Sequence, residues 1–186
     1  MKTRTFILIL AALVLALPVL GGTIVSIDPA DQTVYYGETV NANIDIQNVT
    51  DLYAFDLTVY YNPALLSLTN VSEGAFLPTG GATDFFVLDD TSTPGSIYDI
   101  VDLLETAVSG VSGSGTLAAL QFQVIDGYGQ SGITFDPGSA LFDSNLNNID
   151  ATFNAGQVQT PEPATYGLLG SGLIGLAWFL RKKVRR

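Results

Sequence analysis

Strict alternation of apolar and polar residues in two neighbouring stretches most limits how this chain can fold. Val40, Ala42, Ile44 and Ile46 alternate with Asn41, Asn43, Asp45 and Gln47, and Phe55, Leu57, Val59 and Tyr61 alternate with Asp56, Thr58 and Tyr60. A period of two places successive side chains on opposite faces of a β-strand, so that one face can be buried while the other meets water. Both stretches are therefore predicted to be strands over a hydrophobic core.

Short runs of β-forming residues continue through most of the chain. They are Ile24–Ile27, Thr33–Tyr36, Leu65–Val71, Phe85–Leu88, Ile97–Leu103, Thr116–Ile125, Gly132–Phe135, Ala140–Phe142, Ile149–Phe153 and Gln157–Val158. Turn-forming Gly, Pro, Asn and Asp separate them, as at Asn62-Pro63 and Asp136-Pro137-Gly138. Only Tyr98–Val108 could also form a helix, and since no clear cap marks its ends we expect a strand there. The pattern predicts an all-β fold, a β-sandwich of the jelly-roll kind.

Both ends of the chain differ from this central segment. Lys2 and Arg4 precede the apolar run Phe6–Leu17, and Pro18–Gly22 leads into small residues. This order is typical of a signal peptide. We expect residues 1–21 to be that peptide, cut after Gly21, with an uncleaved N-terminal anchor as the alternative. In both interpretations, the central segment, 22–160, is exported.

The C-terminal segment, 161–186, has the features of a stop-transfer segment. Pro161-Glu162-Pro163 is followed by the apolar run Ala164–Leu180 and then by the basic tail Arg181–Arg186. As a helix, the run would be roughly 25 Å long, close to the thickness of a hydrocarbon core. Clustered Lys and Arg stay on the cytoplasmic side, so the preceding domain should face outward. We therefore expect a transmembrane helix over 164–180 that anchors the domain in the inner membrane, on its periplasmic side.

The helix carries a stripe of small residues at Gly167, Ser171 and Gly175. A four-residue spacing allows another helix to approach closely, so the stripe could dock on a processing enzyme. Alternatively, it reflects only the frequency of glycine in such helices.

All seven Lys and Arg residues lie in the two terminal segments, and the chain has no His. The eighteen Asp and Glu residues all lie between Gly22 and Leu180, where no side-chain salt bridge can form. Such a segment repels nucleic acid, so nucleic acid is not expected as a partner. Without His or Cys there is no catalytic triad, thiolate nucleophile or imidazole metal site. An enzyme is therefore not expected, and a glycan-cleaving carboxylate pair is the remaining catalytic alternative.

Oxygen-bearing side chains alternate at Asp143, Asn145 and Asn147, as in the first half of a calcium loop. The stretch lacks the glycine and the distal glutamate of such a loop, and Asn and Asp readily form turns. We expect a hairpin turn, with a weak calcium site as the alternative and no other cofactor. Asp99 with Asp102 is a further carboxylate pair of the same kind. The run Gly110–Gly115 lacks the pattern of a phosphate loop and is interpreted as a flexible entry to a strand.

The tail resembles the PEP-CTERM sorting signal of Gram-negative bacteria, in the residues Pro161, Glu162 and Pro163 and in the apolar helix and basic cluster that follow them. The resemblance implies recognition by a membrane-embedded exosortase, cleavage near the motif, and release or transfer to the cell surface or extracellular matrix.

The central segment resembles cohesin domains. The resemblance is carried by Gly37–Val40, by Leu52–Leu66, by Gly110–Ala118 with the strand that follows it, and by the late turn Asp143–Asn148. It implies a jelly-roll sandwich that binds a dockerin-like module or polysaccharide through one flat sheet face, with no contact residue assigned by motif. Tyr53, Tyr60 and Tyr61 are candidate binding aromatics, although tyrosines in alternating strands are often half-buried core. The alternative function is an acidic structural component of a biofilm matrix, without a specific ligand.

Overall fold

A computed structural model describes residues 21–88, 95–106, 109–161 and 167–176. The strands are β1 (Thr23–Asp28), β2 (Asp31–Thr33), β3 (Thr39–Tyr60), β4 (Leu66–Glu73), β5 (Thr83–Val87), β6 (Ser96–Leu104), β7 (Val111–Val124), β8 (Gly129–Phe135), β9 (Ala140–Asp143), β10 (Ala151–Asn154) and β11 (Gly156–Thr160). A short 3-10 helix, η1 (Leu77–Gly80), follows β4. The all-β prediction is confirmed, and β6 confirms the strand reading of Ile97–Leu103.

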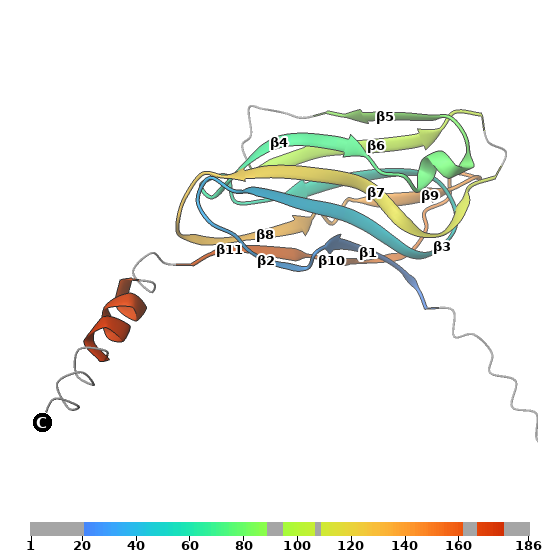
Figure 1. The fold of residues 1–186 in the computed structure, drawn as a ribbon. Helices are drawn as coiled ribbons and strands as arrows, with labels where there is room; N and C mark the ends of the chain where they lie inside the picture. The colour runs from blue at the N-terminus through green and yellow to red at the C-terminus, as the bar shows by residue number, and fades with distance from the viewer. Residues whose placement is uncertain (1–20, 89–94, 107–108, 162–166, 177–186) are drawn as a thin grey trace, which may run out of the picture.

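The long strand β3 belongs to both layers of the sandwich (Figure 1). Its first half pairs with β1 and β7, and its second half pairs with β6, β8 and β9. The register is irregular between the halves, where Asn48 and Asp51 have φ angles of 57° and 61°. Such bulges bend a strand, which lets one continuous strand pass from one layer to the other.

The remaining strands extend these two layers. β10 adds to β1 and β4 adds to β7, while β5 adds to β6. β8 continues through β11 to the edge strand β2. Figure 1 shows β5 and β6 along one side of the sandwich and β11 and β2 along the opposite side.

The core lies between the layers and follows the predicted alternation. Val40, Ile44, Phe55 and Leu57 are fully buried, while their sequence neighbours Asn41 and Asp56 are exposed or half-buried on the outer surface. Burial of such side chains contributes about 1.5–3 kcal/mol each before entropy is counted. The same alternation in β7 and β8 places Leu120, Phe122 and Ile133 in this core.

Two expectations about strand limits were wrong. The strand expected over Thr33–Tyr36 ends at Thr33, because Tyr35 O accepts a hydrogen bond from Glu38 N and closes a turn there. The glycine-serine run expected to be a flexible entry is part of β7, which begins at Val111 and pairs with β3 as far as Leu52.

Some predicted segments lie outside the described residues. These are most of the signal peptide, Glu162 and Pro163, and both ends of the expected transmembrane helix. Residues 167–176 are helical. Among the helices in the part of the chain that the structure describes, none has both the length and the hydropathy needed to span a bilayer.

Candidate functional site

The outer surface of β5, β6 and β3 forms an exposed face with an apolar band, which we call the β5–β6–β3 face. Cross-strand pairing sets Phe86 beside Val101, and Val101 beside Asp56. The adjacent row sets Asp84 beside Leu103, and Leu103 beside Ala54. Ile100, Asp102 and Leu104 of β6 are fully buried, so the alternate residues Val101 and Leu103 face outward.

Two large apolar side chains on this face are substantially exposed. Phe86 is 39% exposed and Leu88, just beyond β5, is 58% exposed. Leu88 is held against β6 because its N–H donates to Asp99 O, at 3.2 Å. Exposed apolar side chains gathered on one sheet face are a feature of protein interaction surfaces.

Two carboxylates lie beside this apolar band. Asp99 adopts a positive φ of 44°, and its N–H donates to Thr58 Oγ1 at 3.4 Å. Partial burial raises the pKa of Asp56, and the nearby charge of Asp99 adds to this rise. The domain has no Lys, Arg or His that could balance this charge. The face therefore suits a partner that brings cations together with apolar side chains.

Of the three candidate tyrosines, only Tyr60 lies on the outer surface of this layer. Its hydroxyl donates to Asp136 Oδ2 at 2.7 Å, which raises the pKa of Tyr60 and lowers that of Asp136. Tyr53 and Tyr61 are half-buried against the core, and the ring of Tyr61 lies 5.0 Å from that of Phe122. Tyr53 and Tyr61 are therefore half-buried residues of the core.

The stretch Asp143–Asn148 forms a tight turn after β9. Asp143 Oδ1 accepts hydrogen bonds from Asn145 N and Asn147 N, both at 2.8 Å, and Oδ2 accepts one from Asn147 Nδ2 at 3.0 Å. These bonds lower the pKa of Asp143. The three candidate calcium ligands are thus neighbours, with the Asp143 oxygens already accepting N–H donors. No group of three or more Asp or Glu suited to a metal ion occurs in the described ranges.

Asp51 joins this turn to the start of β7. Its Oδ1 accepts a hydrogen bond from Gly110 N at 2.6 Å, and its Oδ2 accepts one from Ser144 Oγ at 2.7 Å. The Ser144 hydroxyl, followed by the Gly110 N–H, lowers the pKa of Asp51. Asp51 N also donates to Ser112 Oγ at 2.9 Å, which explains why a serine-rich run is held in a strand.

Asp102 has an environment that its sequence position did not predict. It points inward from β6, is fully buried, and has no hydrogen-bond partner for either carboxylate oxygen among the described residues. Burial, followed by the negative charges of Glu73 and Asp84, raises the pKa of Asp102 to about 7. Glu73 accepts a hydrogen bond from the Thr83 hydroxyl. The side chain of Asp102 thus points into the core, whereas that of Asp99 lies on the outer face. The two do not form the carboxylate pair that the sequence suggested.

The sorting segment is described only in part. Pro161 directly follows β11, while Glu162 and Pro163 lie outside the described residues. Gly167, Ser171 and Gly175 lie in the helical residues 167–176, and Ser171 Oγ donates to Leu168 O at 2.9 Å. Added Cβ atoms at Gly167 and Gly175 would meet nothing within 4 Å, and the same is true of Gly170 and Gly172 outside the stripe.

Apolar side chains on the face were missed because alternation is absent there. Phe85, Phe86, Val87 and Leu88 are all apolar, so the sequence could not show which of them point outward. Only the pairing with β6 distinguishes the outward-facing residues of this run from the inward-facing ones.

Comparison with known proteins finds two families. Residues 25–160 match the family described as "Cohesin domain", and residues 159–183 match the "PEP-CTERM protein-sorting motif". No curated protein sequence matches the chain significantly.

Solved structures show the same fold. CaCohA2 of Clostridium acetobutylicum, solved in complex with a variant of CaDoc0917, is 23% identical, with a TM-score of 0.63 over 75% of this chain and 99% of that one. The non-cellulosomal cohesin of Archaeoglobus fulgidus is 18% identical, with a TM-score of 0.60 over 76% and 93% of the two chains. A type II cohesin of Acetivibrio cellulolyticus is 22% identical, with a TM-score of 0.62 over 74% and 95%.

Proposed function

Because this chain belongs to the cohesin family, we propose that it is an exported, non-catalytic binding protein whose β5–β6–β3 face engages a dockerin-like protein module. The observation that carries this proposal is the apolar band of this face, with Phe86 and Leu88 exposed beside two uncompensated carboxylates. Similar domains have been solved with such partners: the sixth cohesin of the Acetivibrio cellulolyticus scaffoldin B was solved in complex with a double mutant of the Cel5 dockerin.

The Asp56 and Asp99 pair supports binding over catalysis. Both carboxylates lie on an outward sheet surface, next to exposed apolar side chains. A carboxylate pair that cleaves a glycosidic bond must flank a bound sugar inside a cleft. On an open face, the same charges are better suited to attracting Lys or Arg of a partner protein.

Replacing Phe86 with Ser is expected to weaken partner binding at least tenfold, because aromatic anchors contribute much of the energy of a protein interface. Isothermal titration of the full chain in detergent against a panel of recombinant dockerin modules, with millimolar calcium, would measure this. Leu146→Ser removes another exposed apolar side chain, 68% exposed against 39% for Phe86, from the turn after β9, which is outside the β5–β6–β3 face, and serves as the control. Absence of binding by the wild-type chain, or equal affinity of Phe86→Ser and wild type, would contradict the proposal.

The second part of the proposal concerns delivery. The PEP-CTERM match supports a pathway in which the tail first holds the domain at the periplasmic side of the inner membrane. An exosortase would then cut near Pro161–Pro163 and pass the domain to the cell surface or the extracellular polysaccharide matrix. The stripe of small residues Gly167, Ser171 and Gly175 would be the contact for this membrane enzyme.

Processing at both ends should yield a chain without any lysine or arginine. All seven lie at positions 2, 4, 181–183, 185 and 186, outside the segment between the two cuts. Trypsin is therefore expected to leave the denatured, released protein uncut, and an amine-reactive label should add one tag at the new N-terminus. Mass spectrometry of protein from exosortase-producing cells checks both outcomes. Replacing Pro161, Glu162 and Pro163 with alanine should keep the basic tail on the protein, and a wild-type chain that retains Arg181–Arg186 would refute the sorting proposal.

A further inference from the structure

A second surface is formed by β2, β11 and β8, along the edge of the sandwich opposite to β5 (Figure 1). Strand pairing arranges its outward residues in rows. Asp31 pairs with Gln157, which pairs with Gly132, and Thr33 pairs with Gln159, which pairs with Gln130. The residues between them in sequence, Val158 and Ser131, are buried. We call these two rows and their continuation the polar strip.

Aromatic side chains continue the strip in the direction of the C-terminus. Tyr35 follows Thr33 by two positions, and Pro161 follows Gln159 by two. Because β8 runs antiparallel to β11, the corresponding residue on β8's side is Tyr128, two positions before Gln130. Tyr35 is 48% exposed and Tyr128 is 60% exposed. Tyr36, at 70%, lies beside Gly127 at the same end. Among the large exposed hydrophobic residues of the described sandwich, these three tyrosines cluster here.

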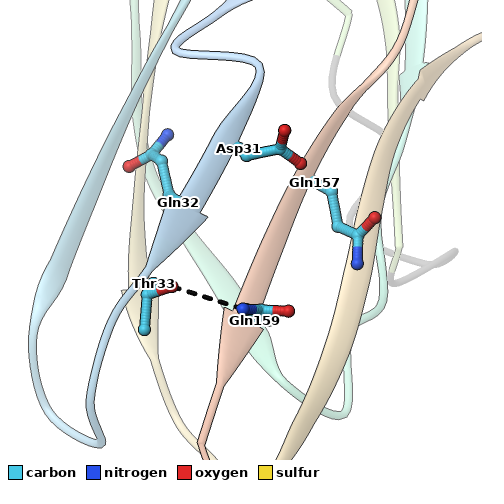
Figure 2. A pocket seen from close by; sticks show the side chains of 5 residues that line it. All are labelled: Asp31, Gln32, Thr33, Gln157 and Gln159. Atoms are coloured by element: carbon cyan, nitrogen blue, oxygen red, sulfur yellow. Dashed lines mark hydrogen bonds between the residues drawn. The ribbon is translucent and has the colours of Figure 1, made fainter.

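The strip is hollowed along its length. One shallow pocket is lined by Asp31, Gln32, Thr33, Gln157 and Gln159 (Figure 2). The next is lined by Tyr128, Gly129, Gln130, Gln159, Thr160 and Pro161. Gln159 lines both, so the two hollows lie next to each other along the strip. At about 3.3 Å of rise per residue, three rows two residues apart extend over roughly 13 Å.

Hydrogen-bonding groups remain available in this groove. Gln159 Nε2 donates to Thr33 Oγ1 at 3.3 Å, as Figure 2 shows, and Gln32 Nε2 donates to Asn41 O. Within the described residues, the side chains of Asp31 and Gln157 make no hydrogen bond. An amide offers two N–H donors and a carbonyl acceptor, which suits ligand hydroxyls that both donate and accept.

The combination of groups indicates the class of ligand. Exposed tyrosine rings provide flat apolar surfaces with a polar edge, which fit the C–H faces of sugar rings. The strip has no cation and one carboxylate, within a domain that carries no Lys, Arg or His. An anionic polymer would be repelled by the domain, whereas an uncharged one would not.

We propose that the polar strip of β2, β11 and β8 binds an uncharged polysaccharide, with Tyr128 as a stacking platform and Gln157 as a hydrogen-bonding group. The strip shares no residue with the β5–β6–β3 face, although β8 pairs with β3 and joins the two surfaces in one layer. One domain could therefore hold a protein partner at one end of this layer and a glycan at the other. The strip ends at Pro161, where the sorting segment begins, and its other residues precede the motif and would remain with the domain after a cut there.

Affinity electrophoresis of the full chain in non-ionic detergent tests this proposal. The gels contain hydroxyethylcellulose, galactomannan or dextran as neutral probes, or alginate as the acidic probe. We expect retardation by at least one neutral polysaccharide and none by alginate. Tyr128→Ala and Gln157→Ala should each weaken the retarding interaction at least fivefold, while Tyr128→Phe should retain it.

Controls separate this proposal from the dockerin proposal. Phe86→Ser should leave glycan retardation unchanged, and Tyr128→Ala should leave dockerin affinity unchanged. Thermal melts of each variant verify that the fold is kept. The proposal is overturned if no neutral polysaccharide in the panel retards the wild-type chain, if alginate retards it equally, or if Tyr128→Ala and Gln157→Ala behave as wild type. Loss of dockerin affinity in Tyr128→Ala would instead identify the strip as a protein-binding surface.

Discussion

Lowering the pH from 8 to 5 is expected to raise the melting temperature of the wild-type protein, and Asp102→Asn is expected to remove most of that rise. Asp102 is fully buried, and its pKa in the folded protein is raised from 3.8 to about 7. The folded state therefore binds a proton at a pH where the unfolded chain has released it. The domain offers no cation as an alternative, because it contains no Lys, Arg or His.

The direction of this pH effect follows from the linkage between proton binding and folding. A carboxyl group with a raised pKa contributes stability that is fully present below the unfolded value and is lost as the pH rises through the folded value. A difference of about 3 pKa units corresponds to at most about 4 kcal/mol, at about 1.4 kcal/mol per unit. For a domain of this size the melting temperature should change by on the order of 10 °C.

The test compares thermal melts of wild type, Asp102→Asn and Asp102→Leu at several pH values from 5 to 8. Asp84→Asn, which removes an exposed neighbouring charge from β5, is the matched control and should keep most of the pH dependence. Below pH 4 the trend should reverse, because the lowered pKa values of Asp51, Asp136 and Asp143 contribute stability that is lost in acid. Equal pH dependence in wild type and both Asp102 variants would show that Asp102 does not carry the effect.

Gly110→Ala is expected to lower the free energy of unfolding by about 3 kcal/mol, a large effect for one added methyl group. A Cβ at this position would lie 2.4 Å from the carbonyl carbon of Asp51 and 2.5 Å from the carbonyl carbon of Leu52. Both are backbone atoms of β3, which cannot move without disturbing the strand pairing. The substitution would also displace Gly110 N, which donates to Asp51 Oδ1 at 2.6 Å.

Urea unfolding of Gly110→Ala and of Gly127→Ala measures this effect. An added Cβ at Gly127 would make only an ordinary contact, 3.7 Å from Tyr36, so this control should unfold close to wild type. Similar stability of both variants would mean that β7 does not approach β3 as closely as the structure has it.

The sequence was most informative where the physical signal is local. Alternation in Val40–Ile46 and Phe55–Val59 predicted both the strands and their buried faces, because a side chain's face in a strand depends only on its position. The same reasoning failed where alternation is absent, as in Phe85–Leu88, and where glycine suggested a loop, as in Gly110–Gly115. In the latter, the contacts that hold the strand come from Asn48 and Asp51, more than 50 positions away in sequence.

The binding residues illustrate the same limit. Three tyrosines were candidates, yet only Tyr60 faces outward, because Tyr53 lies at the irregular register of β3 and Tyr61 packs on Phe122. Nothing in the sequence around Tyr35 or Tyr128 identified either of them as a binding residue. They become part of one surface only because β2 and β8 flank β11.

By itself, the sequence determined the β-sandwich, its cohesin-like character, the uncompensated negative charge of the domain and the sorting motif at its end, because these depend on periodicity, composition and local order. The tertiary structure alone decided which carboxylate is buried without a hydrogen-bond partner among the described residues, which glycine is confined by a neighbouring backbone, and which polar and aromatic side chains share a face. Those properties depend on pairing between strands far apart in the chain. No local pattern encodes that pairing, because many registers would bury the same apolar residues equally well.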